Sequence, residues 1–346
     1  MKKNYVMLAF ATLMMAACAN NDLVDDLVKE EVPQAIGFEP FANKSTRAAI
    51  DDKEDLQEPG VGFTVWGYKT ATATLNWTNQ YTVFDGVDVT YADSKWGYTD
   101  AKYWDRTSTY NFYAVAPSTG SYDIDETTGM ITVNNAVSAK STESMDYVID
   151  RNGVKGVNGN YTGTEHDAVA FDFYHIMSKI SFKLKAAVAE DITVTNLTMT
   201  GWNSGNGTFV QALSITPSIA THTSEWNISS AGTGNVTLVG TGASDTKIEL
   251  PKSKDEKTVK DMYIMVPQTI AANTLTFTID FQIKHSDTDI ETFTAQVGKL
   301  AVAQIWGTDT HTTYTISVGP DVIDFTVSNV CGWDAGTPGT PGVEIE

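Results

Sequence analysis

The chain has 346 residues, a length that suggests about two domains, and its formal net charge is −20. Such acidity argues against binding nucleic acid or an anionic membrane surface through charge. Two cysteines, Cys18 and Cys331, give no disulfide framework. Glycine, threonine and aromatic residues are plentiful and no long stretch has a 3.6-residue apolar period, which is typical of an all-β protein with many turns.

Residues 1–18 read as a sorting signal. Lys2 and Lys3 precede an apolar run of 13 residues, "YVMLAFATLMMAA", which is too short to span a bilayer and suits the core of a signal peptide. Two alanines then precede Cys18, and small residues directly before a cysteine resemble a bacterial lipobox, although Met15 stands where leucine is usual. We predict acylation at Cys18; an ordinary secretory signal with a chance cysteine is the alternative.

Residues 19–47 read as a tether that carries one short strand. The stretch "ANNDLVDDLVKEEVPQ" is polar and acidic, and "AIGFEPF" follows it. In that second stretch Ile36 and Phe38 alternate with glycine and glutamate, as the residues of a half-buried strand do.

The linker "NKSTRAAIDD" carries Arg47, one of only three arginines in the chain. An exposed arginine in a polar, flexible segment is a typical site of proteolysis. A cut between Arg47 and Ala48 would remove residues 1–47, and with them both the lipid and the strand of Ile36 and Phe38. Pulling a strand out of a sandwich leaves an unpaired edge and an apolar groove. The alternative is that Arg47 is a solvated linker residue.

After the linker, apolar residues recur at every second position. The pattern predicts strands over residues 61–66, 110–116, 169–173, 180–185 and 275–284. A slip of phase after Val194 predicts a β-bulge near Asn196.

Alternation of this kind predicts sheets with one packed and one solvated face, hence β-sandwiches. We place the boundary between two sandwiches near residue 172, giving domains over 48–172 and 173–333. Residues 120–168 and 201–260 read as loop-rich connections that carry short strands. Residues 334–346 carry Gly-Thr-Pro repeats and read as a flexible tail.

Motifs that carry chemistry are missing from the sequence. The five histidines lie far apart, and no HExxH, GxSxG, P-loop or dinucleotide fingerprint occurs. We therefore predict no catalytic, cofactor-binding or metal-binding residues. A calcium site at Asp85–Asp93 would lack EF-hand spacing. The eight tryptophans could form a sugar-stacking platform, but core packing explains most of them. His175 reads as a structural histidine, and Cys331 as a small buried apolar residue.

Near the C-terminus, "VIDFTVSNV" has the pattern that a donated strand needs. Ile323, Phe325 and Val327 alternate with polar residues, so main-chain bonds can give affinity and alternate side chains can fill pockets. The alternatives are an ordinary final strand of its own domain, and donation by residues 334–346 instead.

Several segments in order resemble the fimbrillin family of type V pilus subunits. They are the lipobox at Cys18, Thr46-Arg47-Ala48, "KYWDRTSTYNFYAVAP", "FDFYHIMSKISFKL", "MYIMVPQTI" and "IDFTVSNVCGW"; the extension "DAGTPGTPGVEIE" departs from the family pattern. The resemblance implies two transthyretin-like β-sandwich domains, cleavage after Arg47 by an arginine-specific, gingipain-type protease, and assembly by strand exchange.

The sequence thus predicts a fimbrial structural subunit, exported as an outer-membrane lipoprotein precursor, cut after Arg47 and polymerised by donor-strand exchange in support of cell adhesion. Its partners would be other pilus subunits, the protease, the outer membrane before processing, and a host protein or glycan. The alternative is a carbohydrate-binding β-sandwich lipoprotein that stays anchored and is never cut.

Overall fold

The computed structural model describes residues 33–42, 53–71, 79–150, 153–161, 166–213, 224–229, 232–320 and 323–332. In these ranges the regular structure is almost entirely β-strand, and the helix α1 (Lys53–Leu56) is a single turn. The prediction of an all-β fold is confirmed. The described residues from Gln34 onward fall into one compact unit by their contacts. Within the described ranges no helix has both the length and the apolar character needed to cross a membrane.

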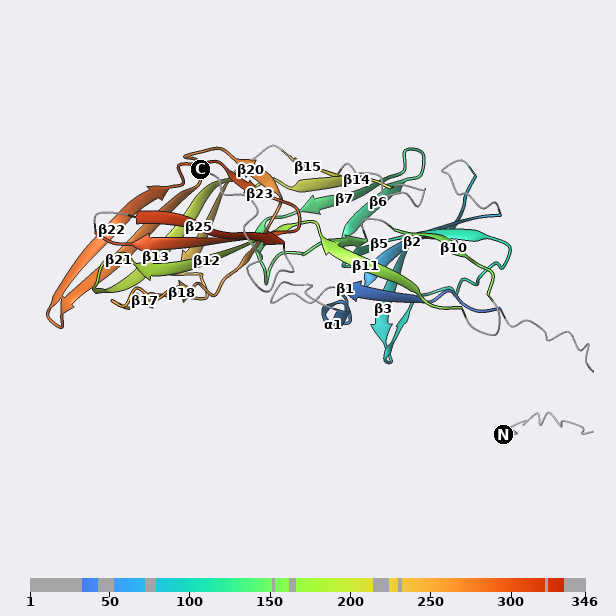
Figure 1. Ribbon diagram of the computed structural model, residues 1–346, viewed down its shortest axis with the longest axis horizontal. Coiled ribbons are helices and arrows are strands. Elements are labelled where there is room, and N and C mark those ends of the chain that lie inside the picture. The colour runs from blue at the N-terminus through green and yellow to red at the C-terminus, as the bar shows by residue number, and fades with distance from the viewer. Residues whose placement is uncertain are drawn as a thin grey trace, which may run out of the picture. The chain divides into compact units, whose positions relative to one another are not determined.

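Strands of the described residues form five sheets, shown in Figure 1. The largest has eight strands in the order β1-β11-β9-β5-β2-β3-β4, and β10 pairs with β5. Its members are β1 (Phe38–Ala42), β2 (Phe63–Thr70), β3 (Tyr81–Ala92), β4 (Lys95–Gly97), β5 (Thr109–Ala116), β9 (Val148–Asp150), β10 (Val154–Asn158) and β11 (Val169–His175).

Two further sheets belong mainly to the second half of the chain. The six-stranded sheet, in the order β25-β24-β12-β19-β8 with β18 on β12, has β8 (Ala139–Lys140), β12 (Ser178–Ala186), β18 (Lys257–Thr258), β19 (Tyr263–Met265), β24 (Thr310–Val318) and β25 (Ile323–Gly332). The five-stranded sheet, in the order β16-β13-β21-β22 with β17 on β13, has β13 (Asp191–Asn203), β16 (Thr233–Val239), β17 (Ile248–Leu250), β21 (Thr276–Ser286) and β22 (Asp289–Lys299).

The two smaller sheets come from the segments that read as loop-rich connections and from the residues after them. A four-stranded sheet runs in the order β15-β14-β7-β6 and contains β6 (Ser121–Asp125), β7 (Met130–Ala136), β14 (Gly207–Ala212) and β15 (Ser224–Ile228). The last sheet pairs β20 (Gln268–Ile270) with β23 (Gln304–Trp306).

The central strands of the eight-stranded sheet are buried on both faces. On β5, Phe112 packs into one apolar core while Tyr113 packs into another, and both side chains are almost fully buried. The second core also contains Phe209 and Val133 of the four-stranded sheet. That sheet covers a face that the sequence pattern left open to water, so the expectation of one solvated face is wrong for β2 and β5.

A third core lies between the six-stranded and five-stranded sheets, where the sequence alternation is most regular. Buried and half-buried residues alternate along β21 from Thr276 to Ile283, as predicted. Phe182 of β12 stacks on Tyr314 of β24 with ring centroids 5.8 Å apart. The predicted bulge is confirmed, because the register of β13 on β21 shifts between Val194 and Asn196.

Strands on either side of residue 172 pair with each other. β14 pairs antiparallel with β7, and β19 pairs antiparallel with β8, where Tyr263 lies opposite Lys140. Two cores nevertheless separate cleanly, since one is built from residues 36–173 and the other from residues 180–325. The division into sandwiches over 48–172 and 173–333 stays a prediction.

Candidate functional site

The candidate site is the place where residues 34–42 enter the N-terminal core. Here β1 pairs in parallel with β11 at the edge of the eight-stranded sheet, with Phe38 opposite Val169 and Ala42 opposite Phe173 (Figure 1). Pro40 lies in this strand, and an edge strand tolerates proline because one side of its backbone makes no ladder bond. β1 thus forms this edge of the sheet and covers β11.

Backbone hydrogen bonds hold the chain just before β1 from a second side. The Ile36 N–H donates to the Lys102 carbonyl at 2.8 Å, and the Trp104 N–H donates to the Gln34 carbonyl at 3.0 Å. The Tyr98 hydroxyl donates to the Ile36 carbonyl at 2.7 Å. Residues 34–36 are therefore clasped by residues 98–104 while β1 itself lies on β11. We call the surfaces that receive residues 34–42 the β1 site.

Phe38 is the aromatic anchor of the β1 site, with 5% of its surface exposed. Its ring contacts five others at centroid distances between 5.1 and 6.5 Å, mostly edge to face, and those partners are Phe63, Phe84, Tyr98, Phe112 and Phe171. Aromatic pairs of this geometry add stabilisation beyond the area they bury. Losing this one ring would therefore open a gap among five partners.

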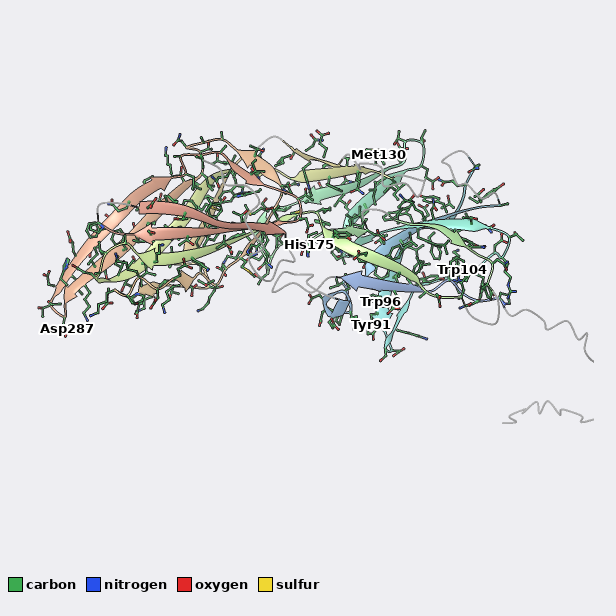
Figure 2. All side chains as sticks on the ribbon, viewed as in Figure 1. Tyr91, Trp96, Trp104, Met130, His175 and Asp287 are labelled. Atoms are coloured by element: carbon green, nitrogen blue, oxygen red, sulfur yellow. The ribbon has the colours of Figure 1, made fainter. Side chains whose placement is uncertain are left out.

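Ile36 lies before the strand begins and is 1% exposed. The predicted strand "AIGFEPF" is thus shorter in the structure, although both of its predicted apolar residues are buried in the same core. A hollow of about 360 Å³ borders them and is also lined by Val89, Trp96 and Tyr98. Trp96 lies beside β1 in Figure 2, and its ring contacts that of Phe63 at 5.1 Å.

Gln34 ties the segment to a loop far along the chain. Its side-chain amide donates to the His166 carbonyl at 2.8 Å, and its side-chain oxygen accepts the His166 N–H. The His166 ring stacks on Trp104 with centroids 3.9 Å apart and planes 17° apart. The Tyr161 hydroxyl accepts the Gln34 N–H at 3.3 Å. Removing Gln34 would leave these polar groups without those partners.

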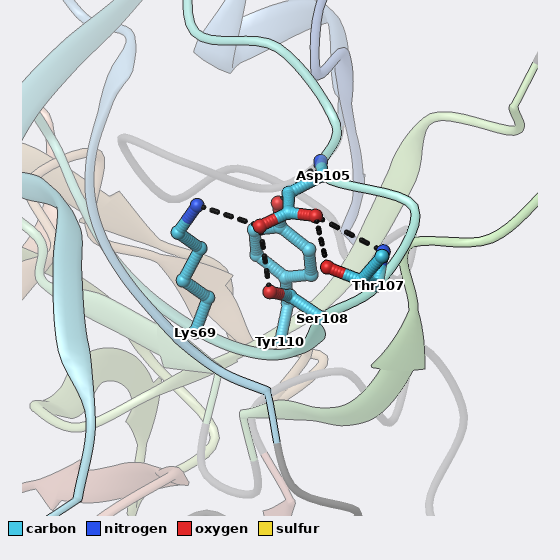
Figure 3. Close-up of polar contacts among 5 residues, drawn as sticks. All are labelled: Lys69, Asp105, Thr107, Ser108 and Tyr110. Atoms are coloured by element: carbon cyan, nitrogen blue, oxygen red, sulfur yellow. Dashed lines mark hydrogen bonds and ion pairs between the residues drawn. The ribbon is translucent and has the colours of Figure 1, made fainter.

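A polar turn, drawn in Figure 3, follows directly after the clasping residues 102–104. The Asp105 carboxylate accepts hydrogen bonds from the Thr107 hydroxyl at 2.7 Å, the Ser108 hydroxyl at 2.8 Å and the Lys69 ammonium at 3.0 Å. The hydrogen bonds from Thr107, with help from Lys69 and Ser108, hold the pKa of Asp105 well below its usual range. The Asp105 N–H donates to the Tyr110 hydroxyl at 2.7 Å. The carboxylate therefore fixes the turn between Trp104 and β5, a structural role.

The second candidate segment is the tail strand, β25, at one edge of the six-stranded sheet. It pairs antiparallel with β24, with Phe325 opposite Ile316 and Val327 opposite Tyr314. Ile323 and Phe325 are half-buried against the C-terminal core, whereas Val327 is 37% exposed. The tail strand therefore occupies a place in its own domain, and a donor role for Ile323, Phe325 and Val327 stays a prediction.

Phe325 is accommodated because the strand beneath it carries glycine. The ring of Phe325 lies 4.9 Å from that of Phe277, and a Cβ on Gly298 of β22 would meet the Phe325 ring well inside van der Waals distance. Gly298 thus leaves the space that Phe325 fills.

We expect Gly298→Ala to loosen the tail strand by about 1–3 kcal/mol, the usual cost of overpacking. Gly97→Ala is the matched control, because a Cβ at that strand glycine has no neighbour within 4 Å. Hydrogen exchange of the β25 amides should rise in the first variant and stay at the parent rate in the second. Equal exchange in both variants would show that Phe325 does not occupy this place in solution.

Beside the tail strand, His311 of β24 is held neutral. The hydroxyl of Ser181 lies 2.9 Å from its Nε2 atom. Burial, with a smaller contribution from the nearby charge of Lys179, lowers the pKa of His311 to about 4. Near neutral pH the imidazole is therefore uncharged and forms part of a polar network that includes Thr313, whose hydroxyl lies 2.9 Å from that of Ser181.

The other sequence candidates fall into structural roles or outside the described residues. Trp66, Trp104, Trp202 and Trp306 are each at most 6% exposed, which argues against a sugar-stacking platform at these residues. His175 is buried with its Nδ1 atom 3.1 Å from the Asp146 carboxylate. Asp85–Asp93 joins no cluster of three or more possible metal ligands in the described ranges.

Three predicted site residues lie outside the described residues: Cys18, the acylation site, and Arg47 and Ala48, the cleavage site. The side chain of Cys331 also lies outside them. Sequence reasoning missed Gln34 and its partner His166, which are 132 residues apart. It also missed Gly298. The segment "KYWDRTSTY" contains Lys102 and Trp104 of the clasp but not Tyr98, and its pattern did not indicate which residues it would bind.

The chain is similar to known proteins in its family pattern and in its fold. A family model described as Fimbrillin-like matches residues 46–333. A fimbrial protein from Bacteroides vulgatus has a similar fold, with a TM-score of 0.62 and 18% identity over 86% of this chain and 99% of that one. A protein with a proposed cell-adhesion role from Bacteroides uniformis gives a TM-score of 0.45 and 14% identity over 86% and 98% of the two chains. No curated protein sequence matches the chain.

Proposed function

The chain belongs to the fimbrillin-like family, and from that membership we propose that it is a structural subunit of a fimbrium, made as a lipoprotein precursor and matured by proteolysis after Arg47. Acylation at Cys18 would hold the precursor at the outer membrane, and the cut would free the subunit to polymerise at the cell surface. The function is mechanical and adhesive, with no catalytic step.

One observation carries the proposal: the N-terminal core is completed by residues that precede Arg47 in the chain. Ile36 and Phe38 are buried in that core, and the first element after the linker, α1, begins at Lys53. A cut after Arg47 would sever the covalent link between the β1 site and the strand that fills it. Because the cut falls between two structured elements, it needs no break in any described strand.

Loss of residues 34–42 would leave the backbone of β11 without a partner strand on one side and the N-terminal core without the side chains of Ile36 and Phe38. β11 would become an unpaired edge strand, which favours addition of another strand. Burying an Ile and a Phe side chain stabilises by roughly 2–3 kcal/mol each, so several kcal/mol would favour a replacement strand before association costs. A second copy of the chain can supply such a strand.

The tail strand is the replacement that we favour. It lies at a sheet edge, so its release breaks one ladder of hydrogen bonds, that with β24. A strand from one copy entering the β1 site of another makes a head-to-tail contact that need not close, and such contacts extend into filaments. Donation of a strand to an exposed sheet edge is a recognised mode of association.

Limited digestion of the full-length precursor with an arginine-specific protease tests the proposal. Intact mass should show one early cut after Arg47, and size measurement should then show growing oligomers. Deleting residues 322–346 should prevent that growth. A cut product that remains monomeric would contradict polymerisation and would favour a subunit that stays anchored and binds glycans.

A further inference from the structure

Two segments at opposite ends of the chain share one apolar pattern. Residues 36–40 read Ile-Gly-Phe-Glu-Pro, and residues 323–327 read Ile-Asp-Phe-Thr-Val. In each, isoleucine and phenylalanine stand two positions apart and a smaller apolar residue follows two positions later. Ile36 and Phe38 fill the N-terminal core, while Ile323 and Phe325 pack against the C-terminal one.

We infer a specific register for the strand exchange, an inference that rests on the proposed function. In the polymer, the tail strand of one copy lies in the β1 site of the next in the same direction as β1. Phe325 then takes the place of Phe38, opposite Val169. Ile323 takes the place of Ile36, and Val327 that of Pro40.

In this register Asp324 takes the place of Gly37, which adds a side chain where the β1 site now has none. The β1 site has room for that side chain. A Cβ at Gly37 would lie 3.7 Å from the Cβ of Ala168, an ordinary van der Waals contact. Gly37 is not among the residues with positive φ, so its backbone conformation suits a non-glycine residue. Gly37 is itself exposed, so the Asp324 carboxylate would reach water.

Main-chain bonding survives the same replacement. The Gly37 carbonyl accepts the Val169 N–H at 2.8 Å, and the Ile36 N–H donates to the Lys102 carbonyl. Asp324 and Ile323 have the same backbone groups and can make both bonds. Pro40 is buried, and valine at its position keeps an apolar side chain while adding one N–H to the edge strand.

Other registers fit the β1 site poorly. A slip of one residue would place Asp324 or Thr326 among the five aromatic rings that surround Phe38, and burying an unpaired polar group there is costly. A slip of two residues would place Ile323 or Val327 in a space shaped for a phenyl ring and leave part of it empty. Phe325 is thus the residue that sets the register.

Engineered disulfides test the register directly. In the full-length chain carrying Cys18→Ser and Cys331→Ser, we add Ala170→Cys together with Thr326→Cys. Glu39 lies opposite Ala170 in the present structure, so Thr326 should lie opposite it in the polymer. Neighbouring strands lie about 4.8 Å apart, within the span that a disulfide bridges. Ala170 and Thr326 are both exposed, so these changes leave the cores intact.

Two control pairs report the alternatives. Asp324→Cys with Ala170→Cys would cross-link if the strand entered in the reverse direction or shifted by two residues. Ser328→Cys with Ala170→Cys would cross-link if it shifted by two residues the other way. After cleavage and mild oxidation, we expect a non-reducing ladder from the Thr326 pair at about ten times the yield of either control, the ratio that 1.4 kcal/mol of preference gives.

The outcomes separate this inference from the proposed function. Oligomers that cross-link through position 324 or 328 would overturn the register while leaving strand exchange intact. Oligomers that cross-link through none of the three would show that the tail strand does not enter the β1 site beside Ala170. A cut chain that forms no oligomers, even under reducing conditions, would overturn the proposed function and the register with it.

Discussion

Replacing Arg47 with lysine should abolish both maturation and polymer growth. The variant keeps the positive charge but removes the guanidinium that an arginine-specific protease recognises, so any effect reports the cut and not the charge. Under a digestion that converts the parent precursor completely, we expect the Arg47→Lys chain to retain residues 1–47 by intact mass. Size measurement should then find it monomeric.

Arg106→Lys is the matched control for this experiment. The Arg106 guanidinium lies 4.0 Å from the centre of the Tyr161 ring, within the folded part of the chain. We expect this variant to be cut after Arg47 and to polymerise as the parent does. Polymer growth by the Arg47→Lys chain at the parent rate would contradict the proposal, since β1 would then still occupy its site in every copy.

Under the proposed function, cleavage would change how strongly β1 is held, although it would remove no contact by itself. A tethered segment acts at an effective concentration on the order of millimolar or above, which a strand from another copy cannot match in dilute solution. Once cut, residues 34–42 keep the clasp of residues 98–104 and the ring contacts of Phe38, but they can dissociate and be diluted. In the proposed polymer, a tail strand that is covalently part of a growing filament would then replace them.

Local patterns in the sequence predicted individual strands well. Alternation identified β21 and β12, and the slip of phase after Val194 located the bulge in β13. These signals depend only on which residues face a core. In a strand with one face on a core, those residues are apolar and recur at every second position. The residues that cover a strand lie elsewhere in the chain. The pattern of β5 alone therefore did not predict that its second face is buried under the four-stranded sheet.

At the β1 site, too, the sequence pattern predicted the strand but not its partners. The pattern of Ile36 and Phe38 indicated a strand with an apolar face, and both residues are buried. The partner strand β11 lies about 130 residues further on, and no local signal selects it or makes the pairing parallel. Gln34 reads as part of a polar tether, yet it bonds His166 and Tyr161 because the folded chain brings them together.

Phe38→Ala should destabilise the uncut precursor by about 3–5 kcal/mol, the range for deleting a buried phenylalanine ring. The structural reason is that five aromatic partners converge on this ring, so the space it leaves cannot close without moving β2, β5 and β11 together. Urea unfolding of the precursor measures the change. Tyr81→Ala is the control, because Tyr81 is 69% exposed and its loss should change the unfolding free energy little.

Cleavage adds a second arm to the same experiment, because Phe38 lies in the part that is removed. After digestion and loss of residues 1–47, the Phe38→Ala chain and the parent have identical sequences, so their unfolding midpoints and polymer growth should coincide. A difference that persists after the cut would mean that the N-terminal segment stays bound, and would contradict its replacement by a donated strand. A precursor that Phe38→Ala leaves as stable as the parent would show that β1 does not hold the N-terminal core together before the cut.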